Sequence, residues 1–400
     1  MISAYDHPPG WDTIHGLFER QTAATPGAAA VCHGSTVRTY AELDEAACRL
    51  AQRLRDRGAR RGGYVGVLLD RSPELVVALL AVLKSGAAYI GLEPAHPPRR
   101  LGAVLADAGA ALVVTRTELA GRLPAEAGPA VLVDEPFAAR PGTGVPAAGA
   151  RPGDLAYVGY AAASAGKPGV MVEHRCVAAF LAALGSRVGF GPGTWTLQFA
   201  GISFDALVGE IFGPLTSGGA VVLPPPGADL LGAGLLRLLE RERVTTAFLP
   251  PSVLSALPAG ELPRLRVLVV GGEGVPREVA ERWERGRDCH SAYGAGETTS
   301  IAAMTGRRLP AVEAYVLDAD LWPVACGTVG ELYLGGPTVC RGYLGRPALT
   351  AELFGPDPFA REPGARLYRT GELARVLPDG RFEVVGRTGD HGRPPARAAR

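Results

Sequence analysis

The sequence predicts an α/β protein built from two doubly wound α/β subdomains and a distorted antiparallel β-barrel. Three observations favour this fold. Apolar residues make up 47% of the 400 residues and charged residues 20%, a balance that can bury a large core. Apolar strand patterns alternate with helical patterns up to about residue 310, as parallel sheets covered by helices require. Beyond residue 311, short strand patterns and turn residues replace them, which indicates an antiparallel unit.

The first subdomain is expected over residues 1–153. Thr39 and Glu42 have the spacing of a capping box and predict a helix that runs to about Arg57. A second helix is predicted to begin at Pro73, and its apolar surface is nearly continuous, as in a helix packed against a sheet. The other expected elements are strands at 64–69, 88–90, 111–114 and 130–133 and a helix at 99–108.

The second subdomain is expected over residues 154–310, and the β-barrel over 311–386, followed by a C-terminal stub at 387–400. In the second subdomain we expect strands at 155–158, 196–199, 220–223, 246–249, 267–270 and 289–292, and helices at 230–243 and 277–285. In the barrel we expect strands at 314–317, 330–334, 366–368, 373–377 and 382–385.

Charge and cysteine content exclude several classes of protein. Lysine and arginine total 41 against 40 aspartates and glutamates, so no basic surplus indicates a nucleic-acid partner. The six cysteines are scattered without a C-x-x-C pair, which favours buried reduced thiols. The N-terminus lacks a signal pattern, and the longest apolar run, 75–83, is too short for a bilayer. These features predict a cytoplasmic protein without a membrane partner.

A loop of small residues at 160–170 is a candidate phosphate site. Small residues let backbone N–H groups approach a phosphate, and the helix expected directly after the loop would add positive potential. The candidate contacts are Ser164 and Gly166, and Lys167 is the loop's one cation and a candidate catalytic residue. The alternatives are an ordinary tight turn and a solvated lysine, and for Lys167 the solvated lysine is favoured.

Nine segments follow one another in an order typical of one enzyme family. They are 40–43, 83–90, 160–170, 204–212, 292–297, 330–336, 341–344, 368–373 and 386–388. In this order they resemble the adenylation domain of nonribosomal peptide synthetases, within the adenylate-forming enzyme superfamily. The resemblance covers nearly the whole chain, and the ordered set is far more specific than any single motif.

The resemblance implies a reaction in two steps, with ATP and Mg²⁺ as cofactors. An amino-acid carboxylate attacks the α-phosphorus of MgATP, and the acyl group then passes to the phosphopantetheine thiol of a carrier protein. By position, Glu297 is the implied catalytic Mg²⁺ ligand, Tyr293 stacks on adenine, and Glu372 and Arg387 reach the ribose. The implied nucleotide contacts also include Gly272, Glu273 and Ser291. An ordinary strand-end turn is the alternative for Tyr293 and Glu297.

The resemblance also implies a pocket for the amino acid. Its lining would be Asp205, Ala206, Gly209, Phe248, Val269, Gly271, Ala292, Ser300 and Ile301. Asp205, the one charged member, is implied to pair with the substrate's α-amino group, which disfavours an aryl- or fatty-acid ligase. Its alternative role is a helix N-cap. Gly209 implies room for an uncharged aliphatic or cyclic side chain bulkier than alanine, unless it only lets two helices approach.

The phosphate loop departs from the family pattern. Both threonines of T-S-G-S-T-G-x-P-K-G are missing, and Gly169 follows Pro168 where the family has lysine. Losing one such transition-state contact typically costs about 3–4 kcal/mol. We therefore expect impaired activity.

Further departures lie at the other nucleotide motifs. Ser291 replaces an amide, Gly296 replaces a threonine, and Glu372 replaces an aspartate. Gly389 stands at the position of the hinge aspartate, and the family's C-terminal lid, with its catalytic lysine, is not found in the sequence. We expect activity that depends on a partner, such as a lid supplied in trans; the alternative is a catalytically inactive module that binds a partner protein, a carrier domain or a ligand.

Residues 346–351 resemble the segment on which small MbtH-like proteins dock in this family. Ala348 is the small residue that would let the partner's aromatic ring approach. The alternative is an ordinary helix start at Pro347.

Overall fold

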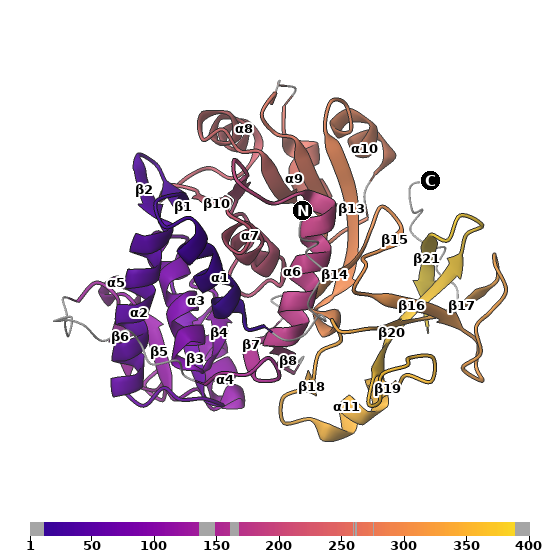
Figure 1. The fold of residues 1–400 in the computed structure, drawn as a ribbon, viewed down its shortest axis with the longest axis horizontal. Coiled ribbons are helices and arrows are strands. Elements are labelled where there is room, and N and C mark those ends of the chain that lie inside the picture. Colours follow the sequence, from indigo (N-terminus) through magenta and orange to yellow (C-terminus); the bar gives the residue numbers. More distant parts are fainter. Residues whose placement is uncertain are drawn as a thin grey trace.

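The computed structural model describes residues 12–135, 149–160, 168–258, 260, 262–274 and 276–388. Figure 1 shows two large sheets with helices around and between them, and a smaller unit formed by the C-terminal part of the chain. The α/β class is confirmed. Ser164, Gly166 and Lys167 lie outside the described residues, as does Gly389.

One large sheet contains seven strands in the described part of the chain. Its spatial order is β18 (Gly342–Tyr343), β8 (Val170–Glu173), β7 (Leu155–Gly159), β4 (Ala88–Leu92), β3 (Tyr64–Leu68), β5 (Leu112–Thr115) and β6 (Ala130–Leu132). The central pairs β3–β4 and β3–β5 are parallel, and β8 is antiparallel to β7. Parallel strands covered on both faces need continuous apolar sequence, which explains the pattern of β3.

The second large sheet contains nine strands within the described ranges. Its order is β15 (Arg307–Arg308), β14 (Ser300–Met304), β13 (Asp288–Ala295), β12 (Val267–Gly271), β11 (Thr246–Leu249), β9 (Trp195–Leu197), β10 (Ala220–Leu223), β1 (Ala29–His33) and β2 (Thr36–Thr39). The strands from β13 to β1 are parallel to their neighbours, and β14, β15 and β2 are antiparallel additions at the two edges.

The third sheet is antiparallel and curled. Its strands are β16 (Glu313–Leu317), β17 (Val329–Gly335), β20 (Arg366–Val376), β19 (Phe354–Pro356) and β21 (Phe382–Arg387). Among the described residues, β16 does not pair with β19 at the other end of the order, so the expected distorted β-barrel takes the form of a curled half-barrel.

Helices fill the space between the two large sheets and cover their outer faces. The helices are α1 (Ile14–Ala24), α2 (Tyr40–Asp56), α3 (Pro73–Ser85), α4 (Pro98–Ala108), α5 (Thr117–Ala120), α6 (His174–Val188), α7 (Ala206–Leu215), α8 (Gly232–Arg241), α9 (Pro251–Ala256), α10 (Arg277–Trp283) and α11 (Pro347–Leu353). Helices α3 and α6 each contact both large sheets, and α7 packs on α6 and on the nine-stranded sheet. Helices α8, α9 and α10 share a separate core on that sheet's other face.

The two large sheets exchange strands across the expected boundary at residue 153. Strands β1 and β2 precede it but join the nine-stranded sheet, whereas β7 and β8 follow it but join the seven-stranded sheet. Tyr40 at the start of α2 also reaches the second unit, donating a hydrogen bond of 2.7 Å to the carbonyl of Gly219. The limits at 153, 310 and 386 remain a proposal for how the chain divides.

Several elements match the sequence patterns and others were missed. The capping box between Thr39 and Glu42 is present. The two strands expected at 366–368 and 373–377 are one strand, β20, because its pairing with β17 continues on both sides of Gly371. Helix α1 and strands β1, β2 and β8 were not predicted.

Candidate functional site

Several of the expected pocket residues lie where strands of the nine-stranded sheet end. Parallel strands bring their carboxyl ends to one edge, and there Gly271 of β12 pairs with Ala292 of β13. Strand β14 returns beside β13, so that Ile301 pairs with Gly294 and Ser300 with Ala295. The sheet therefore places four of the nine expected lining residues together. Phe248 and Val269 pair between β11 and β12, before the ends of these two strands.

Asp205 lies at this edge from the side of α7. A Cβ atom placed on Gly296 would lie 3.9 Å from its Oδ2 atom, so the carboxylate faces the loop after β13. It occupies the position before α7, but its side chain makes no capping hydrogen bond. The alternative role as a helix cap is therefore not seen, and the half-buried carboxylate remains directed at the site.

The electrostatic surroundings of Asp205 favour a cationic ligand. Burial raises its pKa to about 6, and the negative charge of Glu297 adds to this effect, while a backbone hydrogen bond from Ala206 opposes it. In the described part of the chain, no positive side chain contributes to this shift. A carboxylate in such a place is stabilised when a cation pairs with it.

Gly209 serves the close approach of two helices. A Cβ atom at this position would lie 3.1 Å from Leu184 Cδ2 and 3.8 Å from Phe180 Cζ, both on α6, and 3.7 Å from Phe248 Cε1. These contacts are the ones that the helix-approach alternative expects. Phe248 in turn stacks on Phe190, with ring centroids 6.5 Å apart. Room for a side chain bulkier than alanine remains a prediction.

Glu297 is held in a defined position next to Asp205. It belongs to the short 3-10 helix η1 (Gly296–Thr298), and Tyr343 Oη donates a hydrogen bond of 2.8 Å to its Oε1 atom. The backbone N–H of Cys340 donates to its carbonyl at 2.9 Å. Tyr343 was not among the predicted site residues, although it belongs to the family segment 341–344.

A single carboxylate suits Mg²⁺ bound together with a nucleotide. Mg²⁺ is usually held by one or two carboxylates plus substrate phosphates rather than by a cage of protein ligands. Glu297 meets this requirement, and no cluster of three or more metal-ligating side chains occurs in the described ranges. The residues present therefore fit a metal that arrives with ATP.

The expected nucleotide residues Tyr293, Glu372 and Arg387 come together from three segments. Tyr293 Oη donates a hydrogen bond to Glu372 Oε2, and Arg387 Nη2 donates to Glu372 Oε1 at 3.4 Å. Residues 372 and 387 face each other across the pair β20–β21. The ring of Phe382 meets Tyr293 edge to face, with centroids 5.6 Å apart. Burial, and then the charge of Glu372, raise the pKa of the Tyr293 hydroxyl, so it remains a proton donor.

The other expected nucleotide residues have structural contacts of their own. Gly272 has a φ of +88°, which lets the chain turn after β12. The Glu273 carboxylate accepts hydrogen bonds from the Ser252 hydroxyl at 3.1 Å and its N–H at 3.3 Å, and so holds the start of α9. Ser291 is exposed, and its carbonyl accepts from the N–H of Thr305 at 2.6 Å.

The sequence predicted a helix directly after the candidate phosphate loop, but the structure does not show one there. Strand β8 intervenes and pairs antiparallel with β7, and α6 begins only at His174. The prediction missed β8 because its four residues are only partly buried and were assigned to the loop. Gly169 precedes this strand, and a Cβ atom there would lie 2.5 Å from Val158 Cγ1 and 2.6 Å from Tyr160 Cζ. Any larger residue at 169 therefore has to displace these side chains.

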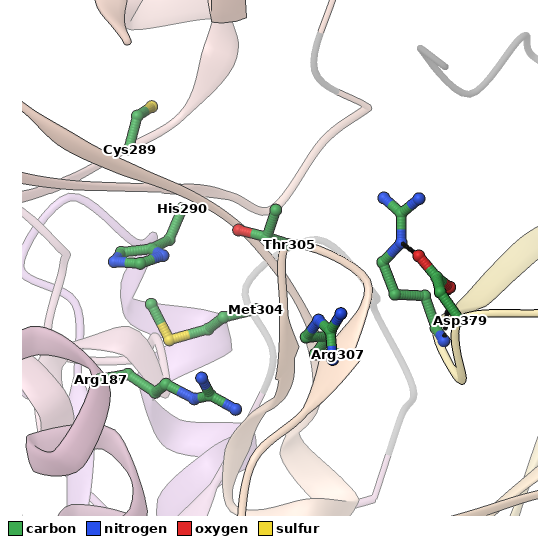
Figure 2. A pocket seen from close by; sticks show the side chains of 8 residues that line it. Arg187, Cys289, His290, Met304, Thr305, Arg307 and Asp379 are labelled. Atoms are coloured by element: carbon green, nitrogen blue, oxygen red, sulfur yellow. Dashed lines mark hydrogen bonds and ion pairs between the residues drawn. The ribbon is translucent and has the colours of Figure 1, made fainter.

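A cavity of about 410 Å³ lies outside the expected site. Its lining residues are Arg187, Cys289, His290, Met304, Thr305, Arg307, Asp379 and Arg381. Figure 2 shows Arg187, Met304 and His290 on one side and Asp379 on the other. Asp379 forms an ion pair with Arg381. The cavity includes none of the expected pocket residues.

No helix in the described ranges has the length and apolar character needed to cross a membrane.

Comparisons with known proteins agree with this geometry. A family model described as AMP-binding enzyme matches residues 18–344. The phosphinothricin tripeptide synthetase PhsC from Streptomyces viridochromogenes is 41% identical over 407 residues, which are 96% of this chain and 37% of that protein. The chain thus spans little more than a third of this relative.

Three solved structures of two proteins resemble the fold closely. The nonribosomal peptide synthetase FmoA3 with α-methyl-L-serine-AMP bound has a TM-score of 0.86 and 31% identity, covering 95% of this chain and 45% of that one. A form of the same synthetase with AMPPNP bound has a TM-score of 0.87. The N-terminal subdomain of NpsA from Klebsiella oxytoca, in complex with 3-hydroxybenzoyl-AMSN, has a TM-score of 0.85 and 28% identity, covering 96% of this chain and 100% of that one.

Proposed function

The chain belongs to the AMP-binding enzyme family, and from this premise we propose that it recognises an amino acid and activates it as its adenylate in a peptide synthetase pathway. One observation supports this best: two carboxylates lie close together at the end of one sheet. Asp205 is suited to pair with an amino group, and Glu297 is suited to bind a metal ion. The synthetase FmoA3 holds an amino-acyl-AMP on the same fold.

The site residues have separate roles in the proposed reaction. Asp205 pairs with the substrate ammonium, and Tyr293 lies against the adenine. Glu372 accepts hydrogen bonds from the ribose hydroxyls, with Arg387 beside it. Because the amino acid and ATP are held at the same time, the substrate carboxylate is oriented toward the α-phosphorus. When bound, Mg²⁺ neutralises charge on the phosphate oxygens, and Glu297 would hold it.

We expect the isolated chain to show little amino-acid-dependent ATP–pyrophosphate exchange. The loop segment after Tyr160 lacks both threonines, and Gly169 follows Pro168 where the family has a lysine; each lost contact of this kind costs about a hundred- to a thousandfold in rate. Exchange should be measured across the amino acids, with and without neighbouring proteins that could supply a lid. Turnover comparable to that of an intact adenylation domain would contradict the expected impairment.

A binding module without catalysis is the second candidate function. The packing around Gly169 favours it, because Val158 and Tyr160 fill the space in which a side chain at 169 would begin. Binding of aminoacyl-sulfamoyl-adenosines without any exchange, even with partner proteins, would indicate this function. Binding of an aryl-sulfamoyl-adenosine in preference to the aminoacyl ones would instead indicate an aryl-acid ligase.

A carrier protein is the proposed acceptor, and an MbtH-like protein the proposed accessory partner. Helix α11 begins at Pro347, as the ordinary alternative predicted, and its Ala348 is exposed and so accessible to a partner's ring. Co-expression followed by gel filtration tests the docking: co-elution with the parent and its loss in Ala348→Arg would support it, and no co-elution would contradict it.

A further inference from the structure

The segment that leads to Asp205 has little regular structure of its own. It runs from the end of β9 through residues 198–204 to the start of α7. Its first N–H, of Gln198, donates to Val222 O on β10, but the N–H groups of Phe199 and Ala200 have no backbone acceptor among the described contacts. The position of Asp205 depends on what holds this segment.

Glu210 holds the segment from α7. Its side chain is completely buried, and its Oε2 atom accepts hydrogen bonds from the N–H of Phe199 at 3.0 Å and of Ala200 at 2.9 Å. Burial raises the pKa of Glu210 to about 8, while these hydrogen bonds and the charge of Arg71 oppose the shift. A buried carboxyl group is a costly residue, and an apolar side chain here would leave two amides without acceptors.

Arg71, in the loop between β3 and α3, also holds Phe199. Its Nη2 atom donates a hydrogen bond of 2.5 Å to the carbonyl of Phe199. Phe199 is therefore fixed at both its N–H and its carbonyl, by side chains from two different structural units.

The remainder of the segment fits closely against β4. A Cβ atom on Gly91 would lie 2.3 Å from the carbonyl oxygen of Ile202, and one on Gly201 would lie 2.4 Å from Glu93 Oε2. A side chain at position 91 would collide with the backbone of Ile202, so Gly91 brings the two backbones into direct contact, whereas Gly201 lies against the side chain of Glu93. The segment has little freedom to shift once Glu210 and Arg71 are in place.

We propose that Glu210 and Arg71 are positioning residues for amino-group recognition, fixing the backbone at Phe199 so that Asp205 faces the ligand's ammonium. This inference rests on the proposed function. The two residues act through Asp205 and do not themselves contact the ligand. Their loss should therefore weaken the contribution of the α-amino group selectively.

The test is ligand binding by calorimetry to the full chain. Three probes are compared: the aminoacyl-sulfamoyl-adenosine that binds best in a panel of amino acids, its desamino analogue, and AMP. In Glu210→Met, we expect affinity for the aminoacyl probe to fall about tenfold, and affinity for the other two to stay within about twofold. Glu210→Gln keeps an acceptor oxygen and should restore most of the loss.

Glu240→Met is the matched control, because Glu240 is exposed on α8. If Glu210→Met does not fold, Arg71→Met carries the same expectation, with Arg71→Lys as the conservative variant. An unchanged preference for the amino group, or an equal loss for all three probes, would overturn the inference while leaving the proposed function intact. A parent chain that binds none of the probes would overturn the proposed function, and the inference with it.

Discussion

The carboxylates on the two sides of the candidate site differ in their partners. On the nucleotide side, Glu372 accepts hydrogen bonds from Tyr293 and Arg387, and Glu297 accepts one from Tyr343. On the amino-acid side, the Asp205 carboxylate has no cation beside it in the described part of the chain, and burial raises its pKa. In the proposed site, the protein itself organises the nucleotide side, whereas the ligand's ammonium would complete the amino-acid side.

This difference predicts where substitutions act. On the nucleotide side, the carboxylates already have hydrogen-bond partners within the protein. The loss of one exposed partner should be tolerated, because the remaining contacts still hold the carboxylates in position. On the amino-acid side, the loss of Asp205 should not be tolerated, because in the proposed site recognition of the ammonium depends on this carboxylate alone. Four experiments test this distinction.

The largest effect is expected from Asp205. Removing one partner of a buried charge pair typically costs about 2–5 kcal/mol. Asp205→Ala should therefore weaken binding of an aminoacyl-sulfamoyl-adenosine about a hundredfold, as measured by calorimetry, and Asp205→Asn should show a similar loss. Affinity for AMP should be unchanged.

Asp320→Asn is the control for this experiment, because Asp320 is exposed in a turn away from the site. If the Asp205 variants bind the aminoacyl probe as tightly as the parent does, the carboxylate does not recognise the amino group, and the pocket assignment loses its support.

A second effect is expected at Gly169, which packs against strand β7. A methyl group at 169 would overlap Val158 and Tyr160, and overpacking of this kind costs about 1–3 kcal/mol. Gly169→Ala should therefore lower the free energy of unfolding, measured by chemical denaturation. Gly169→Lys meets the same obstacle and should not restore pyrophosphate exchange.

Gly153→Ala is the matched control, since a Cβ atom there would meet nothing within 4 Å. Equal stability of the Gly169 and Gly153 variants would show that the space beside β7 is open.

A third effect is a pH dependence confined to the amino-acid side. With a pKa of about 6, Asp205 is charged at pH 7.5 and largely protonated at pH 5, where it cannot pair with an ammonium. Affinity for the aminoacyl probe should fall about tenfold between these pH values. For the unliganded chain the sign is opposite: the raised pKa means that this group's contribution to stability decreases as pH rises toward 6.

The desamino analogue is the control for the pH profile, because it lacks the ammonium. A loss of the same size for both probes between pH 7.5 and pH 5 would assign the titration to another group.

The sequence predicted the elements that bring the site together better than it predicted the site's contacts. Strands β10 and β11 have the predicted limits because each is a short apolar run with clear turn residues around it. The edge strand β2 and strand β8 were missed because a half-buried strand of four residues has no distinctive pattern.

Contacts between distant segments could not be predicted from spacing. The hydrogen bond from Tyr343 to Glu297 joins residues 46 positions apart, and the one from Arg71 to Phe199 joins residues 128 apart. Gly209 illustrates the same point: the sequence shows a missing side chain, but only packing shows that α6 lies against this position. The family order supplied the candidate residues, and the fold supplied their partners.

The smallest effect is expected on the nucleotide side, at Arg387. Its side chain is 73% exposed, and its ion pair with Glu372 is long, so the pair is well screened by solvent. Arg387→Ala should weaken AMP binding only about twofold to fivefold, since Tyr293 still holds Glu372 in place. Tyr293→Phe, which removes the buried hydroxyl that donates to Glu372, should cost more than Arg387→Ala in the same calorimetric measurement. If Arg387→Ala instead abolishes AMP binding while Tyr293→Phe has no effect, the nucleotide side is not pre-organised by the protein, and the distinction between the two sides of the site fails.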